Sequence, residues 1–194
     1  MRRIVLPILV VLSVAPSARA HADEPNLRYQ RPSVEPTAWN GLTINPVEIA
    51  LGRFNLTYER VLNAHLSLAI DGAYMHSSTN LASNDTLSMN AFAGGFSPHF
   101  YFLRPAPGGL YLAPFVRLAY VTGTAQSAVG DGFGYASGAT IGWSWVVGAF
   151  NLKLGAGAAY WDVLARATDS SGRAGTAGFQ GVLPSVDLSI GAVF

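Results

Sequence analysis

The 194-residue sequence contains no cysteine and few charged residues. Without cysteine it has no disulfide, no cysteine-based metal site and no lipid-modified cysteine. Charged residues make up 12% of the chain and hydrophobic residues 50%, whereas the surface of a soluble domain usually carries about 25–35% charged residues. This composition is too apolar for an ordinary soluble domain.

Long apolar runs are also missing after the first 22 residues. No later stretch approaches the roughly 18 apolar residues that indicate a membrane helix. No helical periodicity competes with the alternating pattern described below. Because backbone polar groups in a bilayer must be satisfied within the protein, a closed barrel of strands is the remaining fold that suits so apolar a chain.

The N-terminus has the layout of a secretory signal peptide. Arg2 and Arg3 precede an apolar run at 4–14, which is too short to cross a bilayer as a helix. Two overlapping small-x-small sites follow, and we expect cleavage after Ala20 or after Ala22. Residues 1–20 are therefore predicted to be a signal peptide.

Residues 21–40 hold three prolines and mixed charges without periodicity, which predicts a flexible periplasmic leader. Three of the twelve basic residues lie in the signal peptide, so nine basic residues face eleven acidic ones after cleavage. The mature chain has no basic patch of the kind that binds nucleic acid.

From residue 41 to residue 194 apolar and polar residues alternate, with turn residues between the alternating segments. We predict an all-β fold, an eight-stranded antiparallel up-and-down transmembrane β-barrel. Strands of this type span the membrane with about 9–11 residues. The predicted segments are about 42–51, 53–62, 65–76, 87–103, 110–122, 134–147, 150–163 and 182–194.

The connections alternate in length, as they do in bacterial outer-membrane barrels with short periplasmic turns and longer outer loops. Short connections fall near 63–64, 104–109 and 148–149, and longer polar ones at 77–86, 122–132 and 165–181. The first outer connection, at Gly52, is unusually tight, so 42–62 as one bent strand is an alternative. Within the first segment, Asn45-Pro46 indicates a bulge.

Alternation alone does not tell a membrane barrel from a soluble lipocalin-like barrel, which buries its apolar face. Here the polar faces consist mostly of Gly, Ala, Ser and Thr, which are poor material for a surface that faces water. Aromatic residues also gather near strand ends, as in the girdles at membrane interfaces. We therefore expect Leu112, Leu154 and Ile190 to point outward and Arg117 inward. The girdle residues are Tyr58, Tyr74, Phe100, Phe102, Tyr120, Tyr160 and Phe194.

The last strand carries Leu188, Ile190, Ala192 and the terminal Phe194 on one face. With the signal peptide and the eight segments, it resembles the small outer-membrane β-barrels typified by the OmpA transmembrane domain, OmpX and OmpW. The stretch 45–59 is also similar to a family of such barrels whose function is unknown. The resemblance implies an outer-membrane location, contact with membrane lipids and lipopolysaccharide, and recognition of the terminal strand by the barrel-assembly machinery. It implies no activity, because such folds host many functions.

Ionisable residues at inward positions are candidates for a charge network in the lumen. We predict that Arg117 crosses the lumen to Glu48 and Asp187, with Asp71 nearby, because an eight-strand interior is just wide enough for side chains to fill. A filled lumen favours a structural or surface-interaction role through the outer loops; a narrow gated ion channel is the alternative. The inward set is Glu48, Glu59, Asp71, His99, Arg117, Lys153 and Asp187.

Other motifs give weaker indications. His76 and Ser78 share a face, as a nucleophile and its base require, and the stretch is similar to that of outer-membrane lipid A deacylases. However, the third, orienting group is not clearly placed, with Asp85 in the following loop, so we expect no enzyme. His21, His65 and His99 lack metal-ligand spacing, and the glycine-rich stretch 130–134 is expected to be a flexible outer loop. No cofactor is indicated, and no surface partner is identified.

Overall fold

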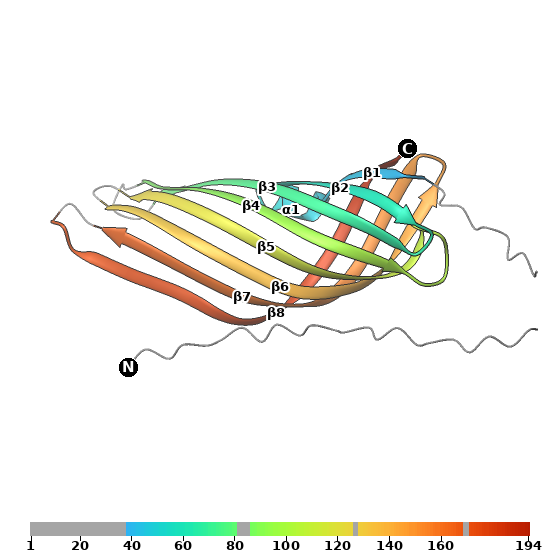
Figure 1. Ribbon diagram of the computed structural model, residues 1–194. Coiled ribbons are helices and arrows are strands. Elements are labelled where there is room, and N and C mark those ends of the chain that lie inside the picture. Colours follow the sequence, from blue (N-terminus) through green and yellow to red (C-terminus); the bar gives the residue numbers. More distant parts are fainter. Residues whose placement is uncertain (1–37, 81–85, 126–127, 169–170) are drawn as a thin grey trace, which may run out of the picture. The chain divides into compact units, whose positions relative to one another are not determined.

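The computed structural model describes residues 38–80, 86–125, 128–168 and 171–194. The predicted signal peptide and almost all of the leader lie outside these residues. Eight antiparallel strands follow one another around a closed ring, so the predicted all-β up-and-down fold is confirmed (Figure 1). The strands are β1 (Asn40–Ile44), β2 (Arg53–Asn63), β3 (Leu66–Asn80), β4 (Thr86–Tyr101), β5 (Gly109–Ala125), β6 (Ala128–Val147), β7 (Phe150–Thr168) and β8 (Ala174–Val193).

One circuit of the ring displaces the strand register by ten residues. Followed from Ile44 through the pairs of successive strands, the register reaches Gln180 on β8. Ile44 itself pairs with Ile190 where β1 closes the ring. A stagger of this kind requires the strands to tilt, typically by about 35–45° from the axis of a closed sheet.

The first predicted strand is wrong beyond residue 44. β1 ends at Ile44 and a one-turn helix, α1 (Pro46–Ala50), follows it. Pro46 suits the start of a helix because its missing N–H has no intrahelical acceptor there. The Asn45 side chain caps the helix by accepting from the Glu48 N–H at 3.1 Å. Across the described residues, no helix combines the length and apolar character that crossing a bilayer demands.

The two longest predicted outer loops are also wrong, because most of 122–132 and 165–181 is strand. β6, β7 and β8 contain 20, 19 and 20 residues, and β2 contains 11. In Figure 1 these later strands run well past α1, which connects β1 to β2. The glycine-rich stretch 130–134, expected to be a loop, lies in β6 and pairs on both sides. Small residues there permit close strand pairing, which composition alone does not distinguish from a loop.

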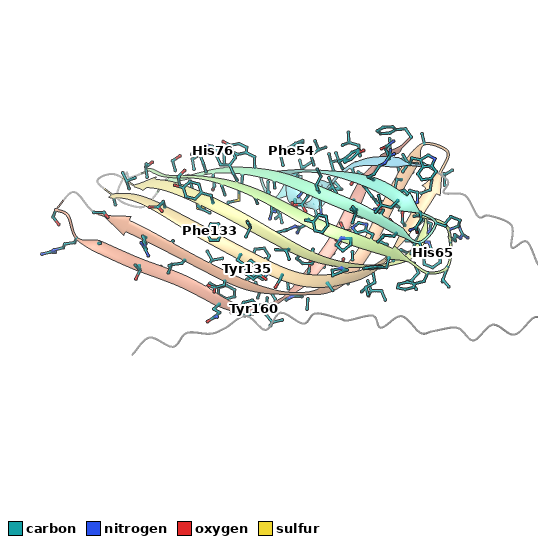
Figure 2. All side chains as sticks on the ribbon, viewed as in Figure 1. Phe54, His65, His76, Phe133, Tyr135 and Tyr160 are labelled. Carbon is teal, nitrogen blue, oxygen red and sulfur yellow. The ribbon has the colours of Figure 1, made fainter. Side chains whose placement is uncertain are left out.

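The predicted facing of the strands is confirmed. Leu112 and Leu154 point outward and are 37% and 49% exposed, whereas Arg117 lines the interior. Phe54 and Tyr160, both at outward positions, lie on opposite sides of the ring in Figure 2. Most of the buried polar side chains lie on the inner face: Thr43, Asn55, Glu59, Ser67, Ser97, His99, Thr140, Ser144, Asn151, Lys153 and Ser189.

The outward apolar side chains form a belt that we call the apolar band. It begins at the end of the ring with the short turns 64–65, 102–108 and 148–149, which we call the turn end. On β5 it runs from Leu110 to Tyr120 and on β7 from Phe150 to Tyr160, which is 11 residues on each of these strands. Its exposed members include Leu56, Tyr58, Ile70, Tyr74, Phe96, Phe100, Leu112, Leu118, Tyr120, Ile141, Trp145, Leu154 and Val186. Beyond it, outward positions hold His76, Asn90, Thr122, Asp131, Asp162 and Gln180.

Candidate functional site in the lumen

The most buried part of the lumen is organised around Glu59 on β2. Its carboxylate accepts hydrogen bonds from Ser67 and from the Tyr101 hydroxyl, the latter at 2.7 Å, and forms an ion pair with Lys153. His99 lies 3.4 Å from both Glu59 and Lys153 and stacks on Tyr111. Both charged side chains are therefore paired and hydrogen-bonded, as buried charges must be if they are to remain ionised.

A second ion pair joins Arg117 on β5 to Asp71 on β3. The Arg117 Nε lies 3.3 Å from Asp71 Oδ1, and the Asp71 side chain is 6% exposed. Gly95 separates the two residues in the register. A Cβ at Gly95 would lie 2.7 Å from the Arg117 Cγ, so a glycine here lets the arginine cross the intervening strand.

Glycines on the intervening strands also allow Tyr111 to reach Asp187. Tyr111, Gly142, Gly155 and Asp187 form one row across β5, β6, β7 and β8. The Tyr111 hydroxyl passes over both glycines and donates to Asp187 at 3.0 Å, and Ser189 donates to the same carboxylate at 2.6 Å. At both places glycine therefore creates the space through which a polar side chain reaches a partner two or three strands away.

The fourth carboxylate, Glu48, lies on α1 beside the N-terminal end of β2. It pairs with Arg53 at 3.3 Å, and the two side chains are 20% and 26% exposed. This pair is therefore more accessible than the pair formed by Glu59 and Lys153.

The structure places all six predicted lumen residues at the interior but pairs them differently from the prediction. Arg117 binds Asp71, while Glu48 binds Arg53 and Asp187 binds Tyr111. Tyr101, Tyr111, Ser67 and Arg53 were not predicted as site residues. Their inward parity was available from the alternation, but their partners depend on the strand register.

Little space remains between these groups. A cavity of about 60 Å³ lies among Asp71, Arg117, Lys153 and Asp187, which is room for only a few water molecules. The rings of Tyr101 and Tyr111 are fully buried on its turn-end side. Nowhere in the described ranges do three or more His, Cys, Asp or Glu residues form a group suited to a metal ion.

Gly155→Ala should lower the stability of the ring. A Cβ there would lie 2.7 Å from the Tyr111 hydroxyl, so the hydroxyl must leave Asp187, and a hydrogen bond to a charged group contributes about 1.5–3 kcal/mol. Gly175→Ala is the control, because its Cβ would meet nothing within 4 Å. Urea unfolding of the two variants measures the difference; equal midpoints would contradict this role for Gly155.

His76 lies outside the lumen, on the outer surface at the far edge of the apolar band (Figure 2). Its Nδ1 is 2.9 Å from Asn90 Oδ1, which also accepts from the Tyr74 hydroxyl at 3.0 Å. Ser78 follows at the next outward position of β3, and Asp85 lies outside the described residues. The side chain that orients His76 is therefore Asn90, which sequence spacing did not single out.

At the C-terminus, the predicted assembly residues Leu188, Ile190, Ala192 and Phe194 occupy alternate positions of the final strand segment. The Phe194 ring is 66% exposed, and its backbone exchanges two hydrogen bonds of 2.9 Å with Asn40. The terminal residue therefore takes part in closing the ring.

Comparison with known proteins identifies one family. Residues 37–170 match the family described as protein of unknown function (DUF3575). Among curated proteins, none matches the sequence. The matched segment includes β1 to β7 and ends before β8 begins.

Proposed function

Since the chain belongs to the DUF3575 family of proteins of unknown function, we propose its role from geometry: it is an outer-membrane β-barrel with a lumen filled by side chains and a structural or surface-interaction role. The observation that carries this proposal is the inverted polarity of the ring. Large apolar side chains face outward while ionised groups are paired inside. Such an arrangement suits hydrocarbon as the surrounding solvent.

The apolar band fits this position in a membrane. Its extent along β5 and β7 matches that of a tilted strand that crosses a hydrocarbon core, and aromatic residues such as Phe100, Tyr120 and Trp145 are exposed on it. In this proposal the turn end faces the periplasm, and the barrel-assembly machinery recognises the terminal strand with Phe194. Membrane lipids and lipopolysaccharide contact the band and its outer edge.

The surface role falls to the projecting parts of β5–β8. Those strands continue beyond the apolar band, where longer loops were expected. Loops and projecting segments carry function more often than the scaffold beneath them. In this proposal the projecting β5–β6 and β7–β8 hairpins make the surface interactions.

Heat-modifiable migration tests the membrane placement. Purified full-length protein should run faster on a detergent gel before boiling than after it, because a closed membrane barrel resists cold detergent. Outer-membrane fractions of expressing cells should contain the folded form. Identical migration with and without boiling, or recovery of the folded chain in the soluble fraction, contradicts the proposal.

The packed lumen predicts no conductance. Paired charges and the buried Tyr101 and Tyr111 rings fill the turn-end half of the interior. We expect no channels in planar bilayers from the wild type or from Arg117→Ala, and discrete openings in either would favour the gated-channel alternative. A lipid A deacylase based on His76 and Ser78 is not favoured, because among the described residues no acidic side chain lies beside them to complete a triad.

A further inference from the structure

Beyond the apolar band the inner face of the strands is apolar and the outer face is mixed. We call this projecting part the shell: residues 121–124 of β5, 128–134 of β6, 161–168 of β7 and 174–183 of β8. The register of these strands is constant, so the inward positions continue those of the buried lumen residues. Each inward position of the shell is Gly, Ala, Val, Leu, Phe or Trp. The outer face carries Asp131, Asp162, Arg166, Thr176 and Gln180, beside the apolar Val129, Phe133 and Leu164.

The inner face of the shell is apolar and accessible. Phe179 and Leu183 point inward and are still 48% and 42% exposed. A cavity of about 450 Å³ lies against this face and is lined by residues that include Val121, Ala165 and Ala177. Asp131 and Arg166 also line it, but both occupy outward positions of their strands. Ligand pockets span about 300–1,000 Å³ and have mostly apolar walls, and a concave apolar surface left open is a mark of a binding groove.

The shell is open along one side. β8 pairs with β1 only from Ile190 to Val193, and β1 ends at Ile44. α1 contacts both β2 and β8 and occupies the part of the gap nearest the turn end. Farther along, the described strands leave the remaining edge of β8 without a neighbour on that side. Figure 1 shows this separation between β8 and the first strands.

A further β-strand is a poor occupant for this edge. Phe194 directs its N–H and C=O to β1, so alternate residues of β8, Pro184 among them, direct theirs to the same side. Pro184 offers no N–H there, and proline on a strand edge opposes strand addition. The open side is therefore suited to a ligand that requires no backbone pairing.

The shell is chemically suited to an uncharged, apolar ligand. At its base, Arg53 and Arg117 are each paired with a carboxylate, Glu48 and Asp71, so the base offers no net charge to a headgroup. The opening meets the far edge of the apolar band, where the outer leaflet ends under the proposed function, on which this inference rests. We propose that one acyl chain of an outer-leaflet lipid enters beyond α1 and lies against the inner face of the shell, with its headgroup outside.

Trp161 provides a reporter for this chain. It occupies an inward position and lines the small cavity next to Arg117 and Ala119. In full-length protein with the other three tryptophans replaced by phenylalanine, and held in nanodiscs, Trp161 should lose most of its fluorescence when the phosphatidylcholine carries a dibrominated acyl chain. Ala165→Phe, which places an aromatic ring in the cavity, should restore the emission. Leu164→Phe, on the outward face of the same strand, should leave the quenching intact.

The outcomes separate this inference from the membrane placement. A variant that retains only Trp145, which is exposed in the apolar band, should be quenched by the same lipid. If Trp145 is not quenched, the membrane placement fails. If Trp145 is quenched but Trp161 is not, or if Ala165→Phe leaves Trp161 quenched, the acyl-chain site is overturned. Quenching of Trp161 by free dibromostearic acid, but not by the brominated lipid, would identify a free amphiphile and likewise overturn the lipid assignment.

Discussion

Glu59→Gln should lower the free energy of unfolding by about 3–5 kcal/mol, because it removes the partner of a buried charge. Lys153 and Glu59 are each only 3% exposed. The glutamine side chain keeps an oxygen that can accept from Tyr101 and Ser67, so the loss isolates the missing negative charge. Urea unfolding in detergent, followed by tryptophan fluorescence, measures this change.

Two controls make the result specific. In the double variant Glu59→Gln/Lys153→Met the unpaired charge is gone, and most of the stability should return. Glu48→Gln breaks a more accessible ion pair, with Arg53, and should cost at most about 1 kcal/mol. If Glu59→Gln is no more destabilising than Glu48→Gln, the cluster around Glu59 does not hold the lumen together.

The fold could be predicted because alternation leaves few alternatives in a chain this apolar. Leu112 and Leu154 mark an outward face in segments too short for membrane helices. A shift of the strand register by one residue would turn that whole face inward. The parity of Glu59, Asp71, Arg117 and Lys153 follows from the same alternation. These features depend only on neighbouring residues in the sequence.

The parts that could not be predicted depend on the partner strand. The stretch 130–134 contains three glycines and one aspartate and has the composition of a loop, yet it pairs with β5 and β7. At Asn45-Pro46 the reverse holds, since an apparent strand becomes a capped helical turn. The composition of such a stretch is compatible with more than one conformation. Which conformation forms depends on whether a neighbouring strand pairs with it.

The pairing of the lumen charges was inaccessible for a similar reason. The prediction took the partners of Arg117 from the width of an eight-strand interior, which assigns no role to the small residues between strands. Asp71, Gly95 and Arg117 lie in one row, so the nearest carboxylate is two strands away instead of across the lumen. Only the register reveals that a glycine separates them.

Leu154→Arg should destabilise the protein in a bilayer by about 2–4 kcal/mol, the cost of an outward arginine near the midplane of a membrane barrel. Leu154 lies in the apolar band on β7 and is 49% exposed, so the substitution removes little internal packing. The expected loss therefore comes from the hydrocarbon around the band. Reversible unfolding by guanidinium in phospholipid vesicles measures it.

Leu164→Arg is the matched control on the same strand and the same face. Leu164 follows Asp162, beyond the band, and its neighbour on the outward face is Arg166. An arginine here should cost about 0–1 kcal/mol, because the penalty falls off near the interface. If the outer face were surrounded by water, Leu154→Arg would carry no such penalty. Equal effects on stability at residues 154 and 164 would therefore mean that no hydrocarbon surrounds the band. The contrast between these two positions thus tests which solvent surrounds the outer face, independently of the acyl-chain site and of the lumen charges.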